Sequence, residues 1–153
     1  MKSVLFVCTA NICRSPMAMG LFKQKVKAEL IDWRIESAGV WAGEGYPATA
    51  NALKVMAERG INISDHRSRQ ITKEMIQEFN LILVMEKGHK EALKYEFQEY
   101  ASRIYLLSEM IGCNSNVEDP IGSSMVDFID TANEIEQILD QGFEQINQLA
   151  EGE

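Results

Sequence analysis

The sequence is short of cysteine and histidine, and this shortage excludes several classes of protein. Its 153 residues include three cysteines and two histidines. An odd, small number of cysteines fits a reducing compartment better than a secreted disulfide framework. His66 and His89 are far apart in the sequence, and no cysteine pair has the spacing of a zinc site. We therefore expect no metal ion and no other cofactor.

Long apolar runs and excess positive charge are also missing. No run approaches the roughly 20 residues of a membrane-spanning helix, and the first three residues lead straight into a strand pattern instead of a signal peptide. The chain has 15 Lys and Arg against 23 Asp and Glu, a net charge of −8, whereas nucleic-acid-binding proteins are more often basic. We expect a soluble, cytoplasmic protein without nucleic-acid or membrane partners.

The chain does contain a regular alternation of strand and helix patterns. Short apolar runs typical of buried strands occur at residues 3–8, 33–40, 81–86 and 103–110. Helical patterns occupy residues 15–30, 48–60, 71–80, 87–97 and 125–149. This order predicts one α/β domain over residues 1–153, a doubly wound four-stranded parallel sheet with helices on both faces. Such a three-layer sandwich is flavodoxin-like or Rossmann-like.

The segment after the first strand, CTANICR, has the features of an anion-binding loop. Ser15 and Pro16 predict a helix start, with Ser15 as the cap. The loop then lies between the carboxyl end of a strand, where such sheets bind ligands, and a helix N-terminus, which favours an anion. Asn11 tolerates the left-handed conformation of a tight loop. Arg14 offers a planar fork of donors that matches two phosphoryl oxygens.

Cys8 lies in the same electrostatic field. A helix N-terminus and an arginine stabilise a thiolate, so we expect Cys8 to be an ionised nucleophile aimed at a bound phosphorus. A thiolate that attacks a phosphate ester needs an acid to protonate the leaving oxygen. Asp119 follows the fourth strand at the same end of the sheet, and Pro120 restricts its backbone to an extended form. Glu118 is a nearby rival, and a solvated loop acid is the alternative interpretation.

Together these residues resemble the low-molecular-weight protein tyrosine phosphatases over nearly the whole chain. FVCTANICRSP resembles the family's C-x5-R-S loop, and ESAGV, DHRSRQIT and an Asp-Pro pair follow in the family's order. The resemblance implies that Cys8 is the nucleophile, Arg14 binds the phosphate and Asp119 is the general acid. It implies six further residues of the phosphate loop: Thr9, Ala10, Asn11, Ile12, Cys13 and Ser15.

The resemblance also implies supporting roles. Ser15 would stabilise the thiolate, and Ser37 and His66 would brace the loop together with Asn11. Cys13 matches a second loop cysteine, which in relatives can form a disulfide with the nucleophile under oxidation. His89, Trp33 and Cys113 are interpreted as structural residues.

The chain departs from the family at the edge of the pocket. Ala10 stands where the family usually has glycine, and Ile121 follows the Asp-Pro pair where many members have an aromatic residue. Trp41 and Tyr46 are therefore candidate pocket walls beside Ile121. The DPIGSS segment is closer to a bacterial subgroup that includes phosphoarginine phosphatases. Those enzymes have threonine at the position of Ile12, so isoleucine there favours phosphotyrosine.

The resemblance implies a phosphotyrosine phosphatase that works through a phosphocysteine intermediate. Its partners would be a phosphoprotein substrate and inorganic phosphate or another oxyanion as product or inhibitor. A phosphoarginine phosphatase on the same scaffold is the alternative. An arsenate reductase would need two further relay cysteines, and Cys113 is alone and distant in sequence. A non-catalytic phosphoprotein-binding module would have no use for Asp119 opposite Cys8.

Overall fold

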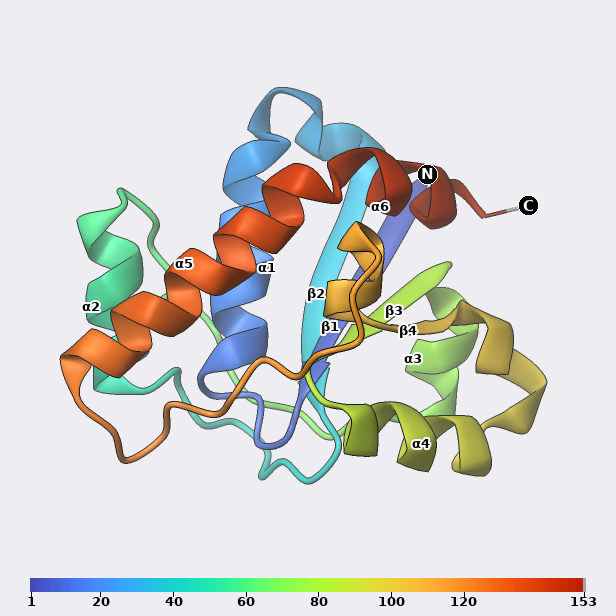
Figure 1. Cartoon of the computed structure of the whole chain (residues 1–153), viewed down its shortest axis with the longest axis horizontal. Helices are drawn as coiled ribbons and strands as arrows, with labels where there is room; N and C mark the ends of the chain where they lie inside the picture. Colours follow the sequence, from blue (N-terminus) through green and yellow to red (C-terminus); the bar gives the residue numbers. More distant parts are fainter. Residues whose placement is uncertain (153) are drawn as a thin grey trace.

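The structure, a computed structural model, describes residues 1–152 and contains a four-stranded parallel sheet, as expected (Figure 1). Its strands are β1 (Lys2–Cys8), β2 (Trp33–Gly39), β3 (Leu81–Val84) and β4 (Ile104–Leu106), in the order β2-β1-β3-β4. The α-helices are α1 (Arg14–Lys25), α2 (Ala50–Glu58), α3 (Lys73–Glu78), α4 (Lys87–Glu96), α5 (Met125–Gln141) and α6 (Phe143–Glu151). Three 3-10 helices are η1 (Lys27–Asp32), η2 (Gln98–Arg103) and η3 (Leu107–Ile111).

The two faces of the sheet build two apolar clusters. Successive side chains of a strand point to opposite faces, so Val4 and Phe6 join one cluster while Leu5 and Val7 join the other. Helices α1, α2, α5 and α6 contribute to the first cluster, and α3 and α4 contribute to the second. Both faces of β1 are therefore covered, which explains its continuous apolar sequence.

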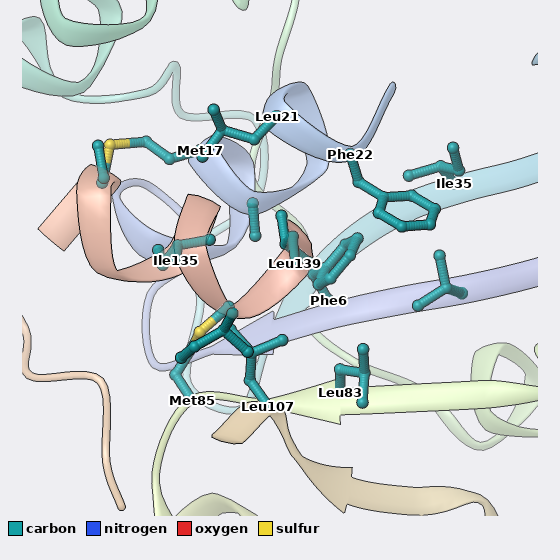
Figure 2. Packing of buried hydrophobic residues seen from close by; sticks show 14 of the residues in the cluster. Phe6, Met17, Leu21, Phe22, Ile35, Leu83, Met85, Leu107, Ile135 and Leu139 are labelled. Carbon is teal, nitrogen blue, oxygen red and sulfur yellow. The ribbon is translucent and has the colours of Figure 1, made fainter. Parts of the chain in front are cut away.

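The larger cluster is centred on aromatic contacts between β1 and α1 (Figure 2). The ring of Phe22 lies edge-on to Phe6, with 5.8 Å between centroids, and edge-on to Trp33, at 4.9 Å. Phe6 and Phe22 have no exposed surface, and each such side chain contributes roughly 1.5–3 kcal/mol by burial. This packing fixes α1, and with it the loop that joins β1 to α1.

Three of the predicted elements differ most from the observed ones, while others, such as the strand predicted over 81–86, end a few residues early. The helix predicted over 15–30 ends at Lys25 and continues as η1. The strand predicted over 103–110 keeps only three strand residues before η3 begins. The helix predicted over 125–149 is broken at Gly142 into α5 and α6, and glycine is needed there because a side chain would collide with Met110 and with the backbone of Ile138. Helix α3 lies within the predicted range 71–80, and the Thr72 side chain caps it by accepting from the Met75 N–H.

The register of the sheet brings the carboxyl ends of β1, β2 and β3, and with them Cys8, to one edge. β1 ends at Cys8, which lies opposite Gly39 at the end of β2, and Val7 lies opposite Val84 at the end of β3. The carboxyl ends of parallel strands meet at one edge, where open α/β sheets bind ligands. No helix among residues 1–152 combines the length and apolar character that crossing a membrane requires.

Candidate active site

The loop between β1 and α1 is tightly folded. Asn11 has φ of 60°, and no other non-glycine residue within 1–152 has positive φ. Short polar side chains such as that of asparagine tolerate this conformation best. The loop also lies against the end of β2, where a side chain on Gly39 would collide with the carbonyl oxygen of Thr9. Glycine is therefore required there by the close approach of two backbones.

Five carbonyl groups of the loop are turned toward the surrounding scaffold, which they contact at 2.7–3.2 Å: those of Cys8, Thr9, Asn11, Ile12 and Cys13. Their donors are the backbone N–H groups of Val40, Trp41, Thr49 and Met17 and the Nε2 of His66. In a planar trans peptide, the next N–H group points opposite to the carbonyl. Five N–H groups of the loop therefore point away from these scaffold donors and are left available to an anion.

Cys8 is buried beside a serine hydroxyl. Its Sγ lies 3.0 Å from Oγ of Ser15, which accepts a hydrogen bond from Nδ2 of Asn11 at 2.7 Å. That bond uses the serine oxygen as acceptor, and the hydroxyl hydrogen has two acceptors within reach, the sulfur at 3.0 Å and the Ala38 carbonyl at 3.4 Å. The sequence-based prediction of Ser15 as helix cap was wrong: α1 begins at Arg14, and the Ser15 hydroxyl serves Cys8 and Asn11 instead.

One side of the loop is held by neutral hydrogen bonds, and we call it the Asn11 flank (Asn11, Ser37, His66 and Arg69). Nδ2 of Asn11 donates to Oγ of Ser37 at 3.0 Å, and the backbone N–H of Arg69 donates to Oδ1 of Asn11 at 3.1 Å. Nε2–H of His66 donates to the Asn11 carbonyl at 2.7 Å. Burial lowers the pKa of His66, which favours this neutral form. The structure thus places Ser37 and His66 against the loop.

The other side centres on a buried arginine, and we call it the Arg14 flank (Arg14, Thr9, Glu86, His89 and Val117). Arg14 is 1% exposed, and its Nη1 donates to Glu86 at 2.5 Å and to the Val117 carbonyl at 2.7 Å. Its Nη2 donates to Oγ1 of Thr9 at 3.3 Å. Nε is buried and has no hydrogen-bond partner among residues 1–152. The guanidinium is therefore oriented by the protein while keeping donor capacity for a ligand.

Sequence reasoning missed Glu86 and His89. Both come from the β3–α4 junction: Glu86 immediately precedes α4, and His89 lies in its first turn. Their position after the third strand, at the ligand-binding edge, was the available signal. Contacts across 72 and 80 residues, to Arg14 and Thr9 respectively, could be recognised only from the folded chain.

Cys13 has a different environment from Cys8. Its thiol is buried at the start of α1, with Oγ1 of Thr49 at 3.5 Å. Burial raises the pKa of the Cys13 thiol to about 11, so this cysteine is a neutral thiol at pH 7. Cys8, Cys13 and Cys113 are all free. Cys13, the candidate disulfide partner of Cys8, is therefore an uncharged thiol within the loop.

Asp119 and an apolar collar complete the site. A small pocket over Cys8 is lined by seven residues: Cys8, Ala10, Ile12, Cys13, Arg14, Asp119 and Ile121. Oδ2 of Asp119 lies 3.6 Å from Nη2 of Arg14, and Oδ1 accepts from the Ile121 N–H at 3.1 Å. Asp119 thus lines the same pocket as Cys8, whereas the rival Glu118 does not, although both acids are exposed.

The two aromatic candidates for the pocket wall lie outside it. Trp41 and Tyr46 are 85% and 61% exposed, and neither lines the pocket over Cys8. The predicted wall is therefore reduced to Ile121, assisted by Ala10 and Ile12. Tyr46 packs instead against Gly43, where any side chain would collide with its ring. No cluster of three or more metal-binding side chains occurs within residues 1–152.

The fold and this loop define an α/β protein with a cysteine at the centre of an oxyanion cradle. Residues 3–151 match the family described as low molecular weight phosphotyrosine protein phosphatase. The chain belongs to this family, whose members are hydrolases.

Individual relatives fall into two named groups. The chain is 35% identical to a protein-arginine-phosphatase of Bacillus subtilis, over 90% of this chain and 92% of the relative. It is also 35% identical to a probable low molecular weight protein-tyrosine-phosphatase, EpsP, of Ralstonia solanacearum, over 97% and 98% of the two chains.

Solved structures give the same assignment. A low molecular weight protein tyrosine phosphatase of T. tengcongensis has a TM-score of 0.90 and 42% identity, with 95% of this chain and 99% of that chain covered. Wzb of Vibrio vulnificus, solved with benzylphosphonate, has a TM-score of 0.83 and 30% identity, over 96% and 98% of the chains.

Proposed function

We propose that this protein hydrolyses phosphotyrosine in proteins through a phosphocysteine intermediate. The observation that carries the proposal is the convergence of Cys8, Arg14 and Asp119 on one small pocket with an apolar collar. Inward N–H groups and Arg14 stabilise the negative charge of the phosphoryl group. The benzylphosphonate complex of Wzb supports a dianion with an aromatic substituent as the kind of ligand that such a pocket accepts.

The first chemical step transfers the phosphoryl group to sulfur. The Cys8 thiolate attacks phosphorus, an S–P bond forms, and the bond between phosphorus and the tyrosine oxygen breaks. Asp119 in its protonated form donates its proton to the departing oxygen, so the tyrosine side chain of the substrate protein leaves as a neutral phenol. The hydroxyl of Ser15, 3.0 Å from the sulfur, stabilises the thiolate before attack and whenever it is regenerated.

The second step releases phosphate. Asp119, now a carboxylate, removes a proton from a water molecule that attacks phosphorus. The S–P bond breaks, Cys8 returns as a thiolate, and inorganic phosphate leaves the loop. Because the product occupies the same cradle as the substrate's phosphoryl group, phosphate and similar oxyanions would inhibit competitively.

Phosphoarginine is the second candidate substrate, because a protein-arginine-phosphatase is among the relatives. The collar of Ala10, Ile12 and Ile121 offers no hydrogen-bond acceptor from its side chains. A phenyl ring needs none, whereas a buried guanidinium group with unpaired N–H groups costs free energy. Asp119 is the single carboxylate among the lining residues. The collar therefore favours the aromatic substrate.

The test compares two variants on three substrates: a phosphotyrosine peptide, a phosphoarginine peptide and the phosphate ester of a strongly acidic phenol. Cys8→Ser should abolish turnover, because a neutral hydroxyl cannot attack unaided. Asp119→Asn should lower kcat on phosphotyrosine by roughly 10²–10⁴-fold, the size of a general-acid contribution. The loss should be clearly smaller on the ester of the acidic phenol, whose leaving group needs little help.

The wild-type enzyme should have a higher kcat/KM for phosphotyrosine than for phosphoarginine. The opposite preference would replace the proposed substrate by the alternative. Equal losses on both esters in Asp119→Asn would mean that another group supplies the proton, and Glu118 would be tested next. If Cys8→Ser kept turnover within tenfold of wild type, the assignment of Cys8 as the nucleophile would be wrong.

We also propose the cytoplasm as the place of action. A nucleophilic cysteine and a second loop cysteine, both free, need a reducing compartment to stay reduced. Peptide mapping of the protein isolated from cells under acid quench should find Cys8 and Cys13 as thiols. A permanent disulfide between them would contradict this location.

A further inference from the structure

His89 belongs to the Arg14 flank but has no part in the chemical steps above. Its ring is 7% exposed, and Nε2 lies 2.9 Å from Oγ1 of Thr9 and 3.8 Å from Oε2 of Glu86. Nδ1 is buried without a hydrogen-bond partner among residues 1–152. An unpaired buried polar atom costs free energy, so the ring's position requires a compensating role.

The hydrogen-bond inventory indicates which nitrogen carries the proton. A buried N–H without an acceptor is rarer than a buried acceptor without a donor, so the proton is on Nε2 and Nδ1 carries the lone pair. Nε2–H of His89 then donates to Oγ1 of Thr9. Burial lowers the pKa of His89, with Arg14 acting in the same direction and Glu86 and Asp119 opposing it. The ring is thus a neutral, single donor.

Thr9 connects this ring to the phosphate-binding arginine. Its Oγ1 accepts from Nη2 of Arg14 at 3.3 Å as well as from His89. A hydroxyl oxygen has two lone pairs, and two donors occupy both of them. The oxygen is therefore held from two directions, at the nitrogen of Arg14 that faces Asp119. Nη1 is already fixed by Glu86 and Val117.

We propose that His89 is a positioning residue that acts through Thr9 on Arg14. By holding the Thr9 hydroxyl, it sets the plane of the guanidinium that receives the phosphoryl oxygens. His89 does not line the pocket over Cys8, so its effect on the ligand passes through the other two side chains. The inference rests on the proposed function for the identity of the ligand, a phosphoryl dianion.

A double-mutant cycle tests the connection. His89→Leu removes the donor, His89→Gln keeps an N–H near the reach of Nε2, and Thr9→Val removes the hydroxyl at nearly constant shape. The measurements are the Kd of inorganic phosphate by calorimetry and kcat/KM on a phosphotyrosine peptide. His89→Leu and Thr9→Val should each raise the Kd of phosphate and lower kcat/KM by roughly 2- to 13-fold, the size of one neutral hydrogen bond. The double variant should lose no more than either single one.

Two controls separate positioning from general structural damage. His89→Gln should recover most of the lost phosphate affinity, whereas a residue that only fills space would not distinguish glutamine from leucine in this way. His66→Gln changes the Asn11 flank, which contacts the loop at Asn11 and not at Thr9, so its effect should add to that of Thr9→Val.

Additive losses for His89→Leu and Thr9→Val would overturn the proposal, because His89 would then act by another route. If His89→Leu fails to fold, Thr9→Val and His89→Gln still decide: phosphate affinity unchanged in Thr9→Val overturns it. Failure of the proposed function has a different signature. In that case the wild type would not turn over phosphotyrosine, while the coupling in phosphate Kd would persist.

Discussion

The two flanks of the phosphate loop are held by different chemistry. On the Asn11 flank, neutral side chains and backbone groups make the contacts with the loop, and the Arg69 guanidinium donates to the Ser37 carbonyl behind them. On the Arg14 flank, an ion pair and a carbonyl hold one side chain in place. The backbone shape of the loop and the position of the charged arginine are therefore held by separate sets of contacts. Substitutions on the Asn11 flank should alter the fold of the loop, and substitutions on the Arg14 flank should alter phosphate affinity and catalytic rate.

The largest expected effect comes from replacing the arginine by a lysine. Arg14→Lys keeps the charge but loses the planar fork that contacts Glu86, Val117 and Thr9 at once. We expect kcat/KM on phosphotyrosine to fall on the order of 10²–10³-fold, as for loss of an oxyanion donor.

The matched control is Arg69→Lys on the Asn11 flank, where the contact with Asn11 uses the backbone N–H. The Arg69 guanidinium pairs with Glu36, where the two side chains are 32% and 31% exposed, and donates to the Ser37 carbonyl. Such a partly exposed pair contributes about 1 kcal/mol or less, so kcat/KM should stay within about fivefold of wild type. Similar losses in the two variants, measured by steady-state kinetics, would remove the distinction between the flanks.

Stability should respond more to the ion pair whose arginine is buried than to the one whose arginines are partly exposed. Glu86, 32% exposed, is the carboxylate partner of Arg14, which is 1% exposed. Glu86→Gln leaves this buried guanidinium without the carboxylate, and an unsatisfied buried group costs about 1–3 kcal/mol. Glu36→Gln removes the partner of Arg34 and Arg69, whose side chains are 39% and 32% exposed, and should cost below about 1 kcal/mol. Urea unfolding measures both, and a larger loss for Glu36→Gln would contradict the comparison.

Acid should weaken both flanks through their histidines. Burial lowers the pKa of His66 and of His89, so the unfolded chain binds protons first as the pH falls. Stability is therefore complete above the ordinary histidine pKa of about 6.5 and declines as the pH falls toward the lower folded values. The free energy of unfolding should decrease from pH 7.5 to pH 5, and less so in His66→Gln. An increase in the free energy of unfolding as the pH falls over this range would contradict the lowered pKa of both histidines.

The smallest effect is expected outside the flanks. Trp41 is 85% exposed and lines no part of the pocket, so Trp41→Ala should change kcat/KM on a small aryl phosphate by at most about twofold. Ile121 lines the pocket and is 49% exposed. Ile121→Ala removes three carbons of a half-exposed side chain, and should lower kcat/KM by about fourfold if the equivalent of one methylene is buried against the substrate. A larger loss for Trp41→Ala would restore the tryptophan as a pocket wall.

The fold was largely readable from the sequence because its strands are buried on both faces. Continuous apolar runs such as residues 81–84 need only local information to be recognised as buried strands. Element ends were less predictable. At Gly142 the helix break coincides with the close approach of Met110, which comes from a distant part of the sequence. The early end of β4 is local: the Glu109 side chain accepts from the Leu106 N–H at 2.8 Å, where η3 begins, and the apolar pattern does not show it.

The candidate site divides in the same way. Cys8, Asn11 and Arg14 occupy one short loop, so their spacing alone predicts a common purpose. Glu86 and His89 could not be found from spacing, because their contacts with Arg14 and Thr9 span 72 and 80 residues. The helix start was wrong for a similar reason: the Ser15 hydroxyl is used by Cys8 and Asn11, and not by the helix it belongs to.

The outward-facing carbonyls of the loop have a consequence for how substrate preference can change. Since the inward donors are backbone N–H groups, anion binding needs no side chain from Thr9, Ala10 or Ile12 except where one contacts Arg14. The side chains of Ala10 and Ile12 border the pocket without holding the phosphoryl group. These two positions can therefore be exchanged to admit a different leaving group while the phosphate cradle stays intact. In this architecture, the residues that select the leaving group can change without changing the groups that bind the phosphate.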